Sequence, residues 1–177
     1  MRGYDLGEAE VTVRTSHFVG FNMAAFRADL LRVGGFPEYL GPNPEFPVSA
    51  CETICLERLL AREMWGVFIG AARVSHYVPA KNRTLGFALA RARMTGKGRA
   101  LAETFEDAAA APPRVDAELG VAALSALRWA AAVIRLRPRA ERFHRLYDLH
   151  RDLGRFQGAW RARRGAEACG HKRLSER

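Results

Sequence analysis

Three short stretches in the first half of the chain have the pattern of β-strands. Val11 and Val13 alternate with polar neighbours, which predicts a first strand. The apolar run 65–69 predicts a second. In residues 73–78 valines alternate with polar residues, and His76 takes one of the valine positions. We therefore expect a third strand with His76 on its apolar face.

Helical spacing of apolar residues predicts two helices between these strands. Residues 30–33 predict a short helix that ends at Gly34-Gly35, since glycine commonly terminates helices. A longer helix is predicted from Ser49, with leucines at positions 56, 59 and 60. Ser49 and Glu52 have the spacing of a capping box, in which the Glu side chain reaches back to the Ser backbone amide.

The second half of the chain has the pattern of long basic helices. Thr84 is expected to cap a helix that runs to about Phe105, and Gly96 and Gly98 are expected to interrupt and weaken it. The run 119–136 is apolar except for one serine and two arginines, and a further arginine-rich helix follows Pro138. We expect a domain of residues 1–107, a linker at 108–114 and a basic helical region of residues 115–177.

Composition narrows the kinds of partner. The 177 residues carry a formal net charge of +9, which favours nucleic acid, acidic lipid headgroups or phosphorylated small molecules. Three cysteines make no disulfide framework, and the N-terminal residues have no apolar signal segment, so we expect a cytoplasmic setting. No uninterrupted apolar run is expected to reach the roughly 20 residues of a membrane-spanning helix.

The order of four short motifs resembles the C-terminal half of the family 2 glycosyltransferases. These motifs are Gly-Phe-Asn-Met-Ala-Ala-Phe-Arg at 20–27, Val-Gly-Gly-Phe at 33–36, a helix from Ser49 that contains Glu52 and Arg58, and a segment that ends in His76. The likeness covers about residues 11–104. It implies an α/β fold, the acceptor-side half of a GT-A domain, followed here by the basic helical appendage.

The resemblance also implies roles for individual residues. Glu52 stands at the position of the catalytic base, the second acid of the family's acidic pair, while Cys51 replaces the first. His76 would neighbour a divalent metal or the donor diphosphate, and Asn22 and Arg27 would form the pocket wall. The alternatives are a capping role for Glu52 and a core position for His76.

Three cations follow His76 in the next helix. Arg91, Arg93 and Lys97 stand where the resemblance implies contacts to donor phosphates or to a lipid diphosphate acceptor. The alternative is a solvated helix face.

The family's donor half ends in an Asp-x-Asp motif that holds the metal and the nucleotide sugar. No Asp-x-Asp occurs in this sequence. We therefore expect a truncated glycosyltransferase or one partner of a split enzyme. The complete enzyme would need Mg²⁺ or Mn²⁺, and this chain alone is expected to bind no metal and to be inactive.

The implied reaction is inverting transfer of a sugar from a nucleotide donor to a hydroxyl of a lipid-linked or polysaccharide acceptor. The alternative is a non-catalytic subunit that supplies the acceptor site to a separate donor-binding chain. Nucleic-acid binding is a weaker third hypothesis, because charge alone suggests it and no zinc-finger, helix-turn-helix or RNA-recognition signature is present.

The basic tail suggests a membrane surface. The apolar run contains Arg128 near its middle, where a charge is costly in a bilayer, and Trp129 and flanking arginines suit an interface. We expect residues 119–164 to lie on an anionic membrane, at the inner face of the cell membrane, with apolar residues of both helices in the lipid. The alternative is a helical hairpin that packs on the rest of the protein.

Overall fold

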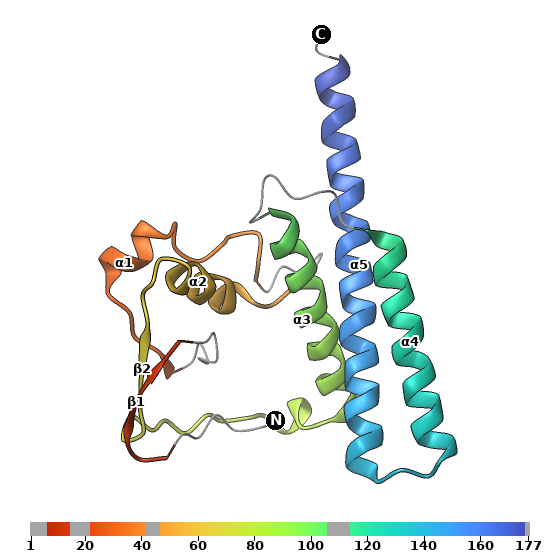
Figure 1. Cartoon of the computed structure of the whole chain (residues 1–177), viewed down its shortest axis with the longest axis horizontal. Helices are drawn as coiled ribbons and strands as arrows, with labels where there is room; N and C mark the ends of the chain where they lie inside the picture. Colours follow the sequence, from red (N-terminus) through yellow and green to blue (C-terminus); the bar gives the residue numbers. More distant parts are fainter. Residues whose placement is uncertain (1–6, 15–21, 42–46, 106–113, 176–177) are drawn as a thin grey trace. The chain divides into compact units, whose positions relative to one another are not determined.

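A computed structural model describes residues 7–14, 22–41, 47–105 and 114–175, and beyond residue 164 its backbone alone (Figure 1). The chain divides into two compact units. The first comprises Met1–Tyr39 and Ala50–Val78, and the second comprises Leu40–Ser49 and Pro79–Arg177. The described chain is mostly helical, with one two-stranded sheet.

The sheet of the first unit consists of β1 (Glu10–Val13) and β2 (Gly66–Ile69). The two strands pair antiparallel, with Val11 opposite Phe68. Both were expected from the sequence and both are confirmed.

The prediction of a third strand at residues 73–78 is wrong. After β2 the Ala72 amide donates to the Ile69 carbonyl and the Arg73 amide to that of Ala71, which turns the chain away from the strand direction. No described strand pairs with the segment, and its side chains are exposed. Alternation alone does not make a strand when no neighbour accepts its backbone hydrogen bonds. His76 is therefore exposed on an irregular segment and is neither on a strand face nor in a core.

The helix α1 (Arg27–Arg32) ends at the expected glycine pair. The Gly34 amide donates to the Leu31 carbonyl and the Gly35 amide to the Leu30 carbonyl, the hydrogen-bond pattern of a Schellman motif. Gly34 and Gly35 have φ of 81° and 66°, a region that side chains with a Cβ rarely adopt. This turn fixes the direction in which the chain leaves α1.

The small core of the first unit forms between this turn and α2 (Cys51–Leu60). Val33 packs with three residues of one α2 face, Cys55, Leu56 and Leu59. The cluster is completed by Met23, Leu30 and Met64, which are partly buried against it.

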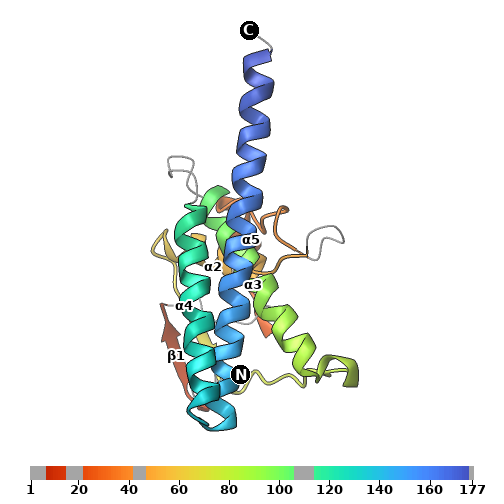
Figure 2. The ribbon, with the colours of Figure 1, turned by 90° about the vertical axis from the view of Figure 1, so that its right-hand side faces the viewer.

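The second unit is built from three long helices, α3 (Leu85–Phe105), α4 (Val115–Ile134) and α5 (Arg139–Ser175), preceded by the short η2 (Ala80–Asn82). The Thr84 hydroxyl accepts a hydrogen bond from the Phe87 amide, which confirms the expected cap of α3. Helices α4 and α5 form a hairpin, and α3 packs against α5 (Figures 1 and 2).

The glycines of α3 do not interrupt it. A Cβ added at Gly96 would overlap the Arg151 carbonyl oxygen on α5, and one added at Gly154 would lie 2.2 Å from the Arg93 carbonyl oxygen on α3. Gly158 meets Lys97 in the same way, at 2.7 Å. The expected interruption at Gly96 and Gly98 is therefore wrong, and Gly96 instead lets the backbones of α3 and α5 approach each other closely.

Arg155 connects all three helices of the second unit. From α5 its guanidinium makes paired hydrogen bonds of 2.8 and 3.0 Å to Glu103 on α3, and others of 2.7 and 3.1 Å to Glu118 on α4. Ser125 adds a buried contact between α4 and α5, donating to the Asp152 carboxylate at 2.6 Å. Bidentate pairs of this kind fix orientation as well as contributing energy.

The two units do not follow the expected division into residues 1–107, 108–114 and 115–177. Helix α3 lies in the same unit as α4 and α5, and most of the expected linker lies outside the described residues. The apolar residues of α5 from Phe143 to Phe156 are half-buried within this unit. They are therefore partly covered by neighbouring residues of the helical unit.

Candidate functional site

Glu52 lies in the first turn of α2, where the helix dipole favours a carboxylate. The capping box expected for it does not form. Ala50 occupies the cap position, without a side-chain cap hydrogen bond, and the Ser49 hydroxyl instead pairs with that of Thr95 at 3.2 Å. The Glu52 carboxylate is half-buried and is not used to begin the helix.

The residue before α2 has an unusual backbone. Ala50 has φ of 122° and ψ of 8°, a conformation that favours glycine. Such strain persists only where the surrounding structure imposes it, and it often occurs next to functional groups. Here it lies two residues before Glu52.

Cys51, in the position of the family's first acid, contacts Glu52 directly. Its thiol donates to Glu52 Oε2 at 3.0 Å. Partial burial, and then this hydrogen bond to a carboxylate, raise the pKa of the Cys51 thiol, so it stays protonated and remains a donor. The thiol therefore fixes the position of one carboxylate oxygen, Oε2.

Arg58 joins α2 to the glycine turn after α1. Its Nη1 donates to the Val33 and Gly35 carbonyls, each at 3.2 Å. The motif at 33–36 and the Glu52 helix are therefore fixed to each other by hydrogen bonds, in addition to the packing of Val33 on α2. Met23 brings the motif at 20–27 to the same cluster.

The expected pocket-wall residues differ in their surroundings. Asn22 Nδ2 donates to the Ala72 carbonyl at 2.7 Å, which ties the first motif to the turn after β2. Arg27 is the first residue of α1 and is exposed. Asn22 thus has a clear positioning role, while Arg27 presents a cation at the surface of the unit.

A metal site does not form around the expected residues. Within the part of the chain that the structure describes, His, Cys, Asp and Glu side chains make no group of three or more that could hold a metal ion. Neither Glu52 nor His76 therefore belongs to such a group among the described residues.

The three expected cations of α3 do not face one way. Arg91 is exposed, whereas Arg93 and Lys97, one turn apart, are half-buried toward α5. Arg93 Nη2 lies 3.5 Å from His150 Nδ1 on α5. Burial, and then the neighbouring cations Arg93 and Arg161, lower the pKa of Lys97.

The same surroundings act on His150. Burial, and then the charge of Arg93, lower the pKa of its imidazole. Sequence reasoning missed His150 and Arg161, because nothing in the α3 sequence shows which face another helix covers. The sequence signal for this contact was the pair Gly154 and Gly158, which lie four residues apart on one side of α5 and face the backbone of α3.

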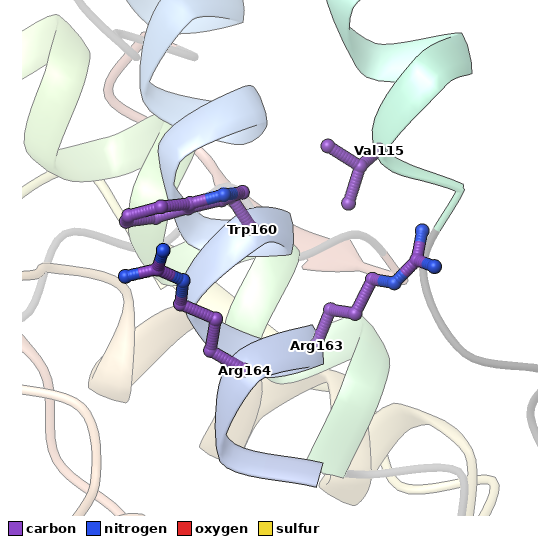
Figure 3. A pocket seen from close by; sticks show the side chains of 4 residues that line it. All are labelled: Val115, Trp160, Arg163 and Arg164. Atoms are coloured by element: carbon purple, nitrogen blue, oxygen red, sulfur yellow. The ribbon is translucent and has the colours of Figure 1, made fainter. Parts of the chain in front are cut away.

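A small hollow lies beside residues 160–164 of α5. It has a volume of about 210 Å³ and is lined by Val115 of α4 and by Trp160, Arg163 and Arg164 of α5 (Figure 3). The Arg164 guanidinium lies 3.9 Å from the centre of the Trp160 ring. Figure 3 shows the Arg163 guanidinium on the opposite side of the hollow, near Val115, and guanidinium groups of this kind can bind an anion such as a phosphate.

Comparisons of this chain with protein-family models, with curated proteins and with solved structures found no significant match.

Proposed function

We propose that this chain is the acceptor-side half of an inverting, family 2-like glycosyltransferase. The observation that carries the proposal is the mutual packing of the motifs at 20–27, 33–36 and 51–58. Met23, Val33 and Cys55 meet in one cluster, Arg58 fixes the glycine turn, and Glu52 lies at the end of that helix without a capping role. The segments that resemble the family in sequence thus pack together around α2, the helix that carries Glu52.

In the proposed reaction the Glu52 carboxylate removes the proton from an acceptor hydroxyl. The resulting oxygen attacks the anomeric carbon of the donor sugar and forms the new glycosidic bond. The bond from that carbon to the nucleoside diphosphate breaks on the opposite face, so the configuration inverts. Cys51 orients the carboxylate through its hydrogen bond to Oε2.

Other parts of the active site lie outside the described residues of this chain. The donor would be a UDP-, GDP- or dTDP-sugar and the acceptor a lipid-linked or polysaccharide hydroxyl at the inner face of the membrane. A Mg²⁺ or Mn²⁺ ion would neutralise the leaving diphosphate, but the described residues do not form its site. The proposal therefore assigns the donor and the metal to a further segment or a separate chain.

His76 and the cations of α3 have supporting roles on this proposal. His76 is exposed, as a residue that neighbours the diphosphate must be. Arg91, Arg93 and Lys97 of the helical unit are proposed, from the sequence resemblance alone, as contacts to phosphates of the donor or of a lipid diphosphate acceptor. Of the three cations, Arg91 is the most exposed.

The test joins this chain to a donor-binding half of the same family, in one polypeptide or by co-expression, and measures sugar transfer. Glu52→Gln should lower kcat by about two to four orders of magnitude, since a positioned base contributes about that much. Glu63→Gln, an exposed acid just after the same helix, is the control and should leave transfer unchanged. Circular dichroism should show both variants folded.

A non-catalytic partner subunit is the second candidate, and Cys51 in place of an acid is the observation that favours it. In that case the joined protein transfers sugar equally well with Glu52 intact and with the Glu52→Gln substitution, because another chain supplies the base. Full activity of Glu52→Gln would therefore remove the catalytic role while keeping the acceptor-side assignment.

A further inference from the structure

Helix α4 presents a long apolar surface to solvent. The outer face of α4 is defined by residues at helical spacing with large exposed fractions, namely Leu119 (52%), Leu124 (46%), Leu127 (68%) and Ile134 (79%). Between them this face carries only Gly and Ala residues, and Arg128 and Arg135 lie along one edge. A contiguous exposed apolar strip of this kind marks an interaction surface.

This helix reaches the length of a membrane span. Over Val115–Ile134, α4 is long and apolar enough to cross a bilayer by length and composition alone. Its sequence is not an uninterrupted apolar run, because it contains Asp116, Glu118 and Arg128. Packing of the opposite face also excludes a simple span.

The opposite face of α4 is attached to a charged helix. Ala122, Ser125 and Ala132 are buried on that side, and Ser125 donates to the buried carboxylate of Asp152. Arg155 of α5 donates a hydrogen bond to Glu118 of α4. Helix α5 is rich in arginine along its length, so α4 cannot enter the bilayer core without carrying those charges with it. The structure therefore favours a helix that lies in the plane of an interface.

Both ends of the outer face have more positive than negative side chains, although Asp116 lies at the N-terminal end in an ion pair with Arg114. Beyond Ile134 the hairpin turn carries Arg135, Arg137 and Arg139, all exposed. At the other end, Leu119 lies one turn from Val115, which lines the hollow with Trp160, Arg163 and Arg164 (Figure 3). Indole and guanidinium groups at the margin of an apolar face are typical of helices that rest on lipid headgroups.

We propose that the second unit docks on an anionic membrane surface through the outer face of α4, with a lipid phosphate in the hollow at Trp160. The apolar side chains enter the boundary between headgroups and acyl chains, and the arginines at both ends bind phosphates. A second copy of the chain is a poorer occupant. Because both ends are positive, pairing two outer faces in either direction places arginine clusters against each other. The proposal does not depend on the glycosyltransferase activity.

The test is flotation of the full chain with vesicles of phosphatidylcholine, with and without phosphatidylglycerol. Binding should require phosphatidylglycerol and should weaken as salt increases, because exposed charges are screened. Binding to the neutral vesicles at the same level would overturn the proposal. So would retention in the membrane after alkaline extraction, which indicates a spanning helix.

Two paired substitutions locate the surface. Leu124→Glu with Leu127→Glu should lower vesicle affinity at least about tenfold, because two leucines no longer enter the lipid. Leu31→Glu with Val67→Glu, at exposed apolar positions of the first unit, is the matched control and should bind as the unchanged chain does. Circular dichroism and the melting temperature show whether each variant is folded.

The hollow has its own variant. Arg163→Ala with Arg164→Ala should weaken binding more than Arg62→Ala with Arg83→Ala, which removes the same charge at other exposed sites. Equal losses would mean that net charge alone acts and that the hollow binds no phosphate. If light scattering instead shows a dimer that the Leu124 and Leu127 substitutions dissociate, and no vesicles bind, the outer face is a self-association surface and the proposal is wrong.

Discussion

Replacement of Gly154 by alanine tests the close approach of α3 and α5. A Cβ at this position would lie 2.2 Å from the Arg93 carbonyl oxygen and 2.9 Å from its carbonyl carbon. Both atoms belong to the backbone, so no side chain can rotate away. To reach an ordinary contact of 3.4 Å the helices must separate by about 1.2 Å, the difference between 3.4 and 2.2 Å.

The energetic balance of Gly154→Ala has two opposing parts. Alanine gains about 1 kcal/mol over glycine in a helix interior. Overpacking of a close interface costs about 1–3 kcal/mol, and the backbone clash places this site at the upper end. Separation also weakens the packing of Ala92 and Ala159, which are fully buried in this unit. We expect a net loss of about 2 kcal/mol in the free energy of unfolding.

A matched control exists on the neighbouring helix. A Cβ at Gly120 of α4 would meet no atom within 4 Å, so Gly120→Ala should stabilise the protein by up to about 1 kcal/mol. Urea denaturation followed by circular dichroism measures both variants. If Gly154→Ala is as stable as Gly120→Ala, the two helix backbones do not approach as described.

Two further predictions concern the backbone before α2 and the arginine that joins the three helices. Ala50→Gly should raise the free energy of unfolding by about 1 kcal/mol, because it relieves a positive φ at a non-glycine residue; an unchanged or lower melting temperature would contradict that strain. Burial alone would raise the pKa of Glu103, but the hydrogen bonds from Arg155 and Arg99 lower it below its ordinary value of 4.5. The stability that Glu103 contributes is therefore complete above about pH 4.5 and is lost as the pH falls through the lowered folded-state value. Arg155→Met should lower the free energy of unfolding by about 1–2 kcal/mol at neutral pH, a figure discounted because Glu103 is 45% exposed. In urea titrations at different pH values, the stability of this variant should fall less steeply as the pH is lowered. An equally steep fall would show that other carboxylates dominate.

Local signals in the sequence predicted the features that depend on neighbouring residues. The glycine pair after α1 and the threonine before α3 each act within a few residues, and both behave as expected. The first two strands were also found, because they pair with each other. The segment at 73–78 has an equally clear alternation but has no partner among the described strands, so its pattern predicted an element that does not form.

The candidate site shows the same limit. Ser49 has the right residue type and spacing for a capping box, yet its hydroxyl is taken by Thr95, 46 residues away. Gly96 is unfavourable for an isolated helix and becomes favourable only when the backbone of α5 lies against it. Position 52 was selected from the sequence by resemblance. That it has no capping role follows only from the tertiary contact of Ser49.

The route of the chain through its two units restricts how they can be separated. Residues 40–49 belong to the helical unit, although 29 residues of the other unit, 50–78, stand between them and α3. This segment contributes two buried side chains, Leu40 and Val48, and a backbone that lies against Gly98 of α3. A fragment cut at Pro79 would therefore leave part of its own interior behind. The helices can be isolated intact only if the fragment from Pro79 onward is re-joined to that short upstream piece, so a plain N-terminal truncation series would underestimate their autonomy.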